Sequence, residues 1–362
     1  MQVTQLKTTL VELPFAKPIG TAIHAMRSVG CVLVEVHAEG GDVVGQSYVF
    51  TLNAARLRAF DETVRGFADF VVGRDPHDTE RVWHDIWSEI NPTGHKGITI
   101  SALSAIDVAL WDLVGRSAGL PLHKMFGACR NEVDTYASSG LWLSLSTDEL
   151  VTEAAGFVDQ GFHAMKIRLG SERAADDVAR VGAVRDAIGP DIDLLSDANQ
   201  KFRPKEAIRL GRQLEQFNLV WFEEPVAAYD LAGHAQVRAA LDMPIASGET
   251  EYTRYGIKAM IDAKAADILM PDLQRIGGFS EFRKAAATAA ANNIPVSSHI
   301  FTEQSLCLAG SLENCISVEH MDWFSPLFNE EMELVDGKLL VPDRPGHGFT
   351  FDHAAIERYS FR

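Results

Sequence analysis

The chain has 362 residues, with 33 Lys and Arg against 50 Asp and Glu, so its formal net charge is −17. A field of that sign repels nucleic acids and anionic membranes, so we expect neither as a partner. The sequence shows no apolar run of about 18 residues and no secretory signal, which predicts a cytoplasmic protein without a membrane span.

The first 125 or so residues predict an α+β unit. Alternating and β-branched stretches predict strands at 2–13, 31–38 and 43–50, and apolar residues at helical spacing predict helices at 79–90 and 100–114. Between the first two strands, residues 15–30 are expected to form a loop. Strands followed by helices favour an α+β arrangement over an α/β one.

From about residue 130, short apolar strands alternate with amphipathic helices, which predicts a parallel β/α barrel. A doubly wound open sheet is the alternative, disfavoured because no GxGxxG or Walker sequence follows a strand. Beyond residue 330 we expect only short strand and loop. The predicted strands are 133–137, 164–168, 192–197, 219–223, 245–249, 268–272, 295–299 and 316–319, and the helices include 147–160 (with Thr147 as N-cap), 204–216, 256–263 and 280–292.

Most of these strands end in a residue capable of chemistry. Successive positions are 20 to 31 residues apart, one β/α unit each, and the carboxyl ends of barrel strands converge on one mouth. Taken singly, an Asp after a strand is often a helix N-cap and a lone His is often a hydrogen-bonded core residue. The strand-end residues are Lys166, Arg168, Asp197, Glu223 (with Glu224), Glu249, Asp272, His299 and Glu319.

Three consecutive strands end in the carboxylates Asp197, Glu223 and Glu249. Helix capping explains such a run poorly, because buried charges are costly unless they are paired or bind a metal. Oxygen ligands without Cys or His select a hard cation, so we expect Mg²⁺, with Mn²⁺ as the second choice, rather than zinc. Such a site leaves coordination positions for a small carboxylate substrate.

The order of the motifs along the chain resembles the mandelate racemase subgroup of the enolase superfamily (the mandelate racemase/muconate lactonizing enzyme family). The matching stretches are GQSYVF (45–50), SALSAIDVALWDL (101–113), AMKIRLG (164–170), LLSDANQ (194–200), WFEEP (221–225), SGE (247–249), LMPDLQRIGG (269–278), PVSSHIF (295–301) and SVEHMDW (317–323). The resemblance implies a modified TIM barrel, (β/α)₇β, at 126–330 and an α+β capping domain at 1–125. Residues 331–362 would return to that capping domain, and the chain would form a homo-oligomer, a dimer or an octamer.

The resemblance also implies roles for the strand-end residues. Asp197, Glu223 and Glu249 would bind Mg²⁺, and Lys166 would lie against the substrate carboxylate. His299 would act as general base or acid, paired with Asp272, and Glu319 would be a protonated acid bonded to the substrate. Asn199 and Ser139 occupy positions where the family places polar contacts to the metal or the substrate.

Arg168 departs from the family pattern, which has a second lysine at this position. With a reference pKa of about 12.5–13.8, deprotonating Arg at pH 7 costs roughly 7–9 kcal/mol. Arg168 is therefore expected to be a permanent cation that holds a carboxylate or hydroxyl; pairing with a metal-ligand carboxylate is the alternative. Racemisation by two bases loses its simplest route, whereas elimination by one base does not.

Residues of the capping domain bear on the substrate. Lys17 and His24 make the 15–30 segment polar, which favours a polyhydroxy acid, although both also suit a solvated loop. Tyr48 and Trp142 favour an aryl substrate instead. The three strand-end carboxylates, the Asp272–His299 pair and Arg168 nevertheless lead us to expect an acid-sugar dehydratase. Lys17, His24 and Tyr48 are its expected substrate contacts in the capping domain. The alternatives are a 2-hydroxy-acid racemase or epimerase, and a non-catalytic metal- or ligand-binding barrel.

Overall fold

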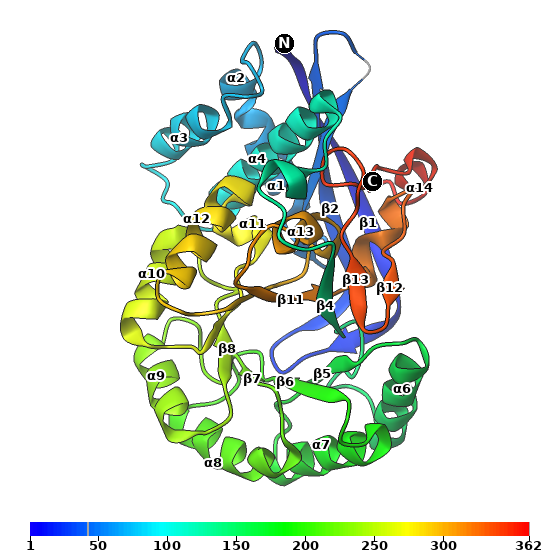
Figure 1. The fold of residues 1–362 in the computed structure, drawn as a ribbon, viewed down its shortest axis with the longest axis vertical. Coiled ribbons are helices and arrows are strands. Elements are labelled where there is room, and N and C mark those ends of the chain that lie inside the picture. The colour runs from blue at the N-terminus through cyan, green and yellow to red at the C-terminus, as the bar shows by residue number, and fades with distance from the viewer. Residues whose placement is uncertain (42, 362) are drawn as a thin grey trace.

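The computed structural model describes residues 1–41 and 43–361 and shows a smaller N-terminal part set against a barrel (Figure 1). The N-terminal part begins with an antiparallel sheet of β1 (Val3–Gly20), β2 (Ala25–Ala38) and β3 (Val44–Leu52), in that order. The expected loop at 15–30 is wrong in extent. After an irregularity the β1–β2 pairing resumes as far as Gly20 and Ala25, so only a short turn remains.

Five helices complete this part: α1 (Leu57–Gly66), α2 (Ala68–Val71), α3 (Thr79–Glu89), α4 (Ile98–Ala118) and α5 (Leu122–Met125). Helix α4 is apolar enough and long enough to cross a membrane, but 83% of its most apolar window is buried inside the protein. It packs on β3 on one side and on α11 (Leu273–Ile276) and α12 (Gly278–Ala290) of the barrel on the other. Burial on both sides explains its apolar composition.

Eight parallel strands form a closed barrel, and all eight predicted strands are confirmed. Closure comes from the pairing of the last strand with the first, Val318 beside Thr135. The strands are β4 (Glu132–Ala137), β5 (Ala164–Arg168), β6 (Asp193–Asp197), β7 (Phe222–Glu223), β8 (Ile245–Ser247), β9 (Ile268–Leu269), β10 (Val296–Ser298) and β11 (Cys315–His320).

Helices connect each strand to the next, which gives the (β/α)₇β order. Ser146, not Thr147, is the N-cap of the first connecting helix, because its hydroxyl accepts from Glu149 N while the Glu149 carboxylate accepts from Ser146 N. Besides α11 and α12, the helices are α6 (Thr147–Asp159), α7 (Ala174–Ile188), α8 (Pro204–Leu214) with the 3₁₀ turn η1 (Glu215–Phe217), α9 (Leu231–Ala240), α10 (Thr253–Ala263) and α13 (Thr302–Ala309).

The C-terminal segment returns to the N-terminal part. After η2 (Asp322–Leu327), the hairpin β12 (Leu334–Val335) and β13 (Lys338–Leu340) pairs with β4. His347 Nε2 then lies 3.0 Å from Gln46 O. Beyond α14 (His353–Arg358), Phe361 N donates to Leu10 O at 2.9 Å. The capping unit is thus completed by the end of the chain, and domain boundaries at 125 and 330 stay predictions.

Aromatic and aliphatic side chains fill the barrel interior beneath its mouth. Tyr136 and Trp221 meet edge to face at 5.3 Å, and Leu195, Ala246 and Met270 pack around them. This apolar cluster excludes water from the barrel interior beneath the polar residues of the mouth. Because the local dielectric constant is low there, charge interactions among those residues are strong.

Candidate active site

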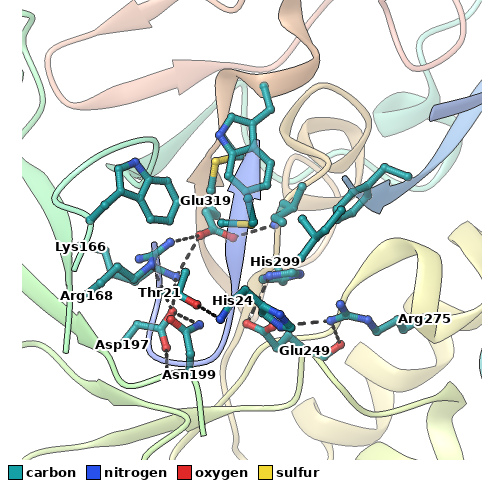
Figure 2. A pocket seen from close by; sticks show the side chains of 17 residues that line it. Thr21, His24, Lys166, Arg168, Asp197, Asn199, Glu249, Arg275, His299 and Glu319 are labelled. Atoms are coloured by element: carbon teal, nitrogen blue, oxygen red, sulfur yellow. Dashed lines mark hydrogen bonds and ion pairs between the residues drawn. The ribbon is translucent and has the colours of Figure 1, made fainter. Parts of the chain in front are cut away.

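One pocket collects most of the predicted site residues at the carboxyl ends of the strands (Figure 2). Because alternate residues of a strand face the same side, β5 directs both Lys166 and Arg168 inward. The lining residues are Thr21, His24, Met26, Phe50, Leu52, Trp142, Lys166, Arg168, Asp197, Asn199, Glu249, Arg275, His299, Ile300, Glu319, Met321 and Trp323.

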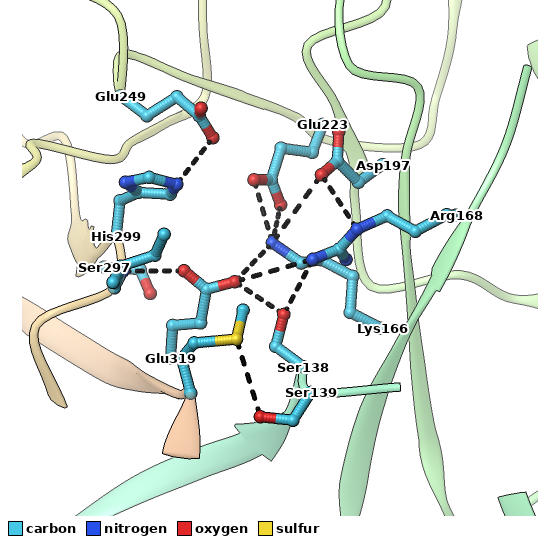
Figure 3. Close-up of polar contacts among 12 residues, drawn as sticks. Ser138, Ser139, Lys166, Arg168, Asp197, Glu223, Glu249, Ser297, His299 and Glu319 are labelled. Atoms are coloured by element: carbon cyan, nitrogen blue, oxygen red, sulfur yellow. Dashed lines mark hydrogen bonds and ion pairs between the residues drawn. The ribbon is translucent and has the colours of Figure 1, made fainter. Parts of the chain in front are cut away.

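Lys166 lies among carboxylates (Figure 3). Its Nζ is 2.9 Å from both oxygens of Glu223, 2.9 Å from Glu319 Oε1 and 3.9 Å from Asp197 Oδ2. Burial lowers the pKa of Lys166, but the charges of Glu223 and Glu319 outweigh it and raise the pKa above its usual range. Burial raises the pKa of Glu223 to about 8 even with Lys166 against it. Lys166 thus contacts carboxylates from three different strands at the barrel mouth.

The oxygen donors at the barrel mouth suit a metal ion. Within residues 1–41 and 43–361, no three acidic, His or Cys groups are gathered closely enough to form a metal cluster, and Lys166 holds the position beside Glu223. Asp197 and Glu223 are nevertheless paired neighbours on β6 and β7, and Glu249 follows β8. Asn199 Oδ1 is buried without a partner in the described structure. Carboxylate and amide oxygens are the donors that suit a hard divalent cation.

His299 bridges two carboxylates. Its Nδ1 lies 2.7 Å from Asp272 Oδ2 and its Nε2 lies 3.2 Å from Glu249 Oε2. Burial lowers the pKa of His299, but Glu249 and the hydrogen bond to Asp272 raise it to about 9. Asp272 is also the N-cap of α11, accepting from Arg275 N at 2.8 Å, so the capping and pairing roles coexist.

Glu319 differs from the predicted protonated acid. Burial raises its pKa, but the charges of Lys166, His299 and Arg168 lower it below its usual range, so its carboxylate form is favoured here. Glu319 Oε1 accepts from Ser138 Oγ at 2.6 Å and Oε2 from Ile300 N at 2.7 Å. The contact with Ile300 braces the turn after His299, where Ile300 has a φ of 45° that β-branched residues rarely adopt.

Arg168 is buried with unused donors. Its Nη2 donates to Ser138 Oγ at 3.0 Å, its Nε is 3.6 Å from Asp197 Oδ2, and its guanidinium carbon is 4.8 Å from the Trp142 ring centroid. Nε and Nη1 have no hydrogen-bond partner within the described chain. Such a cation is suited to hold acceptor oxygens of a ligand.

Other predicted contacts are scattered. His24 and Asn199 line the pocket, whereas Ser139 accepts from Asp322 N at 3.0 Å behind it. Tyr48 is 2% exposed and points its hydroxyl to Glu303, and Lys17 is exposed beside a separate groove. We therefore drop Tyr48 and Lys17 from the proposed substrate contacts.

Comparison with known proteins identifies the family. Residues 4–127 match the model "Mandelate racemase / muconate lactonizing enzyme, N-terminal domain", and residues 149–355 match "Enolase C-terminal domain-like". The chain belongs to the mandelate racemase/muconate lactonizing enzyme family. Within the enolase superfamily it is 36% identical to L-talarate/galactarate dehydratase of Salmonella typhimurium, over 97% of this chain and 89% of the relative.

Solved structures of the family agree in fold. L-Talarate dehydratase from Polaromonas sp. JS666, complexed with Mg and L-glucarate, has a TM-score of 0.94 at 34% identity, covering 100% of this chain and 98% of that one. A racemase from Streptomyces coelicolor with bound magnesium has a TM-score of 0.94 at 33% identity, covering 99% and 100%.

Sequence reasoning missed several residues of this family member's pocket. Arg275 Nη1 donates to Glu249 O at 2.8 Å and lies 3.6 Å from Glu249 Oε1. Its position three residues after Asp272, in LMPDLQRIGG, was an available signal. Phe50 and Met321 likewise stand in the matching stretches GQSYVF and SVEHMDW. Thr21 and Leu52 lie outside every matching stretch and carry no such signal, because tertiary packing brings them to the mouth.

Proposed function

We propose that the protein dehydrates an acid sugar, an aldonate or aldarate, to a 2-keto-3-deoxy acid in a Mg²⁺-dependent reaction. The observation that carries the proposal is the convergence, in one pocket, of the carboxylates Asp197, Glu249 and Glu319 with the buried Arg168 and with His299, whose Nδ1 pairs with Asp272. The Salmonella and Polaromonas relatives, both named as dehydratases, support it.

Asp197, Glu223 and Glu249 are the proposed Mg²⁺ ligands, with Mn²⁺ as a substitute. Bound Mg²⁺ would supply positive charge next to the substrate carboxylate, where negative charge develops. A cation shared by these three carboxylates would also release the Lys166 ammonium from Glu223. Lys166 already lies 2.9 Å from Glu319, and there it could hold the substrate carboxylate.

His299 is the proposed general base. A proton on Nδ1 satisfies Asp272. A cation held by Glu249 would offset the charge that raises the pKa of His299, and Nε2 would then be free to take the proton from C2 of the substrate. The C2–H bond breaks, and His299 then protonates the departing C3 hydroxyl, which leaves as water. The resulting enol takes up a proton at C3 and becomes the 2-keto-3-deoxy acid, so the net reaction is the loss of one water.

A second candidate, racemisation or epimerisation of a 2-hydroxy acid, is favoured by the name of the Streptomyces structure. It needs a proton donor on the face opposite His299. Arg168 stands at the position of the family's second lysine, and a guanidinium exchanges protons poorly near pH 7. Dehydration by one base therefore stays the preferred reaction.

Assembly and location are also proposed. We expect a homo-oligomer, a dimer or an octamer, in the cytoplasm, acting on a small carboxylate without nucleic acid or membrane partners. Sedimentation velocity on the purified protein measures the assembly directly, and a monomer at micromolar concentration would contradict it.

A library of aldonic and aldaric acids tests the activity. Each acid is incubated with the enzyme and Mg²⁺, and 2-keto-3-deoxy products are trapped as semicarbazones. We expect product from at least one acid with Mg²⁺ and none with EDTA. If recovered acids are epimerised at C2 instead, the racemase candidate replaces dehydration; if no acid reacts, both reactions are wrong.

A further inference from the structure

Three residues that follow the proposed metal ligands in the chain are connected by side-chain hydrogen bonds. Gln200, Glu224 and Thr250 stand three, one and one positions after the ligands of β6, β7 and β8. Gln200 Nε2 lies 3.1 Å from each carboxylate oxygen of Glu224 and 3.1 Å from Thr250 Oγ1, and Thr250 Oγ1 donates to Glu224 Oε1 at 3.2 Å. We name these three residues the Gln200–Glu224–Thr250 bracket.

The orientation of the bracket is fixed from outside. Ala228 N donates to Gln200 Oε1 at 2.9 Å, which sets the amide so that Nε2 faces Glu224 and Thr250. Gln200 N also donates to Glu224 O at 2.8 Å. Gln200 and Glu224 have φ values of 66° and 39°, which L-residues adopt only where neighbouring contacts hold them. The bracket supplies such contacts at the two turns.

The burial of Glu224 is energetically unfavourable unless its carboxyl group has a function beyond packing. It is 1% exposed, and among the described residues its carboxylate has neutral side-chain donors, Gln200 and Thr250, and no ion-pair partner. Burying a carboxyl without a cation is unfavourable. A buried acceptor that ties three ligand-bearing loops together has a use that an apolar side chain at the same place cannot provide.

We propose that the Gln200–Glu224–Thr250 bracket is a positioning device for the metal site. By joining the loops after β6, β7 and β8, it fixes where Asp197, Glu223 and Glu249 converge. The inference rests on the proposed Mg²⁺ site. Outer contacts of this kind typically change metal affinity by about 10–100-fold when removed.

Isothermal titration of Mg²⁺ into EDTA-treated protein tests the bracket. Thr250→Val removes the hydroxyl and keeps the shape, and Gln200→Met removes the amide. We expect each to weaken Mg²⁺ binding by about 10–100-fold, and Thr250→Ser to restore it to within about threefold of wild type. Turnover at saturating Mg²⁺ should stay near that of wild type, because the positioning residues touch neither substrate nor reacting atoms.

Thr135→Val is the matched control. Thr135 is equally a threonine with a satisfied hydroxyl, bonded to Val318 O at 2.8 Å within the barrel wall, and its loss should leave Mg²⁺ affinity unchanged. The proposal is overturned if Thr250→Val and Gln200→Met both keep the Mg²⁺ affinity of wild type. It is also overturned if Thr135→Val loses as much Mg²⁺ affinity as they do. If wild type itself binds no Mg²⁺, the proposed metal site fails, and the bracket fails with it.

Discussion

At the scale of a single residue, the proposed choice of dehydration over racemisation depends on Arg168. Its guanidinium reaches Ser138 at 3.0 Å and stacks on Trp142, with two further donors free among the described residues. Because arginine is a fixed cation, the proposed substrate would meet a charge rather than a base on this side. The substitution was visible in the sequence, but its contacts were not.

Arg168→Lys should create a second proton-transfer group. A buried lysine can be tuned to titrate near neutral pH, so acid recovered from D₂O should include the C2 epimer carrying deuterium, which wild type should not form. Arg168→Met should form no C2 epimer and should show a kcat/KM lower by about 10–100-fold, since charged hydrogen bonds contribute about 1.5–3 kcal/mol. Proton NMR of the recovered acid distinguishes the two epimers. Formation of the C2 epimer by wild type would show that a second base exists elsewhere.

The strand-end residues could be predicted because each β/α unit delivers its last residue to the same mouth. Their ionisation could not. The lowered pKa of Glu319 depends on Lys166, His299 and Arg168 meeting around it in space. Likewise, Tyr48 lies on a predicted strand, yet its contact with Glu303, far away in the chain, follows from tertiary packing.

At the scale of elements, α4 and α12 hold the capping domain on the barrel through a buried carboxyl. Asp107 accepts from Ser280 N at 2.9 Å and from Ser280 Oγ at 2.6 Å. Burial raises the pKa of Asp107 to about 7, against an ordinary value of 3.8, although the Ser280 bonds lower it. The folded state therefore binds more protons than the unfolded state between these two pH values.

Asp107→Asn should flatten the pH dependence of stability. In wild type this carboxyl makes the free energy of unfolding fall as pH rises from about 4 to about 7, by up to about 4 kcal/mol at 1.36 kcal/mol per unit. Asn keeps an acceptor and a donor for Ser280 and loses the titration. Urea unfolding at several pH values between about 4 and about 7 measures this pH dependence. If the free energy of unfolding of Asp107→Asn falls with pH as steeply as that of wild type, Asp107 is not its source.

Secondary-structure elements were predicted correctly where the local sequence pattern determines them. They were missed where pairing with a distant strand determines them. The apolar strand runs and the capping residues near 147 located the barrel units to within a few residues. The turn at 21–24 was missed because the pairing of β1 with β2 is interrupted between Pro14 and Ile19 and then resumes with Ile19 opposite Met26.

At the scale of the whole molecule, the C-terminal segment connects the barrel with the capping domain. Phe349 is fully buried, with its ring centroid 5.9 Å from that of Phe328, and Arg116 Nη2 donates to Phe349 O at 2.6 Å. The family resemblance predicted this return, whereas composition and periodicity alone indicated only short strand and loop after residue 330.

Phe349→Ala should destabilise the fold by about 3–5 kcal/mol, the usual cost of emptying a buried aromatic site. Val335→Ala, at a side chain 54% exposed, is the control and should change stability by less than about 0.5 kcal/mol. Chemical denaturation monitored by circular dichroism compares them. Equal stability of the two variants would mean that the segment is not a structural part of the core.

The most direct test of the proton-abstraction mechanism is proton NMR of the reaction in D₂O, with the acid sugar found in the library screen. With Mg²⁺, wild type should give a 2-keto-3-deoxy acid carrying deuterium at C3, and His299→Asn should be slower by about 10²–10⁴-fold, the usual contribution of a general base. Product formation by His299→Asn at the wild-type rate, or by wild type in EDTA, would contradict the mechanism.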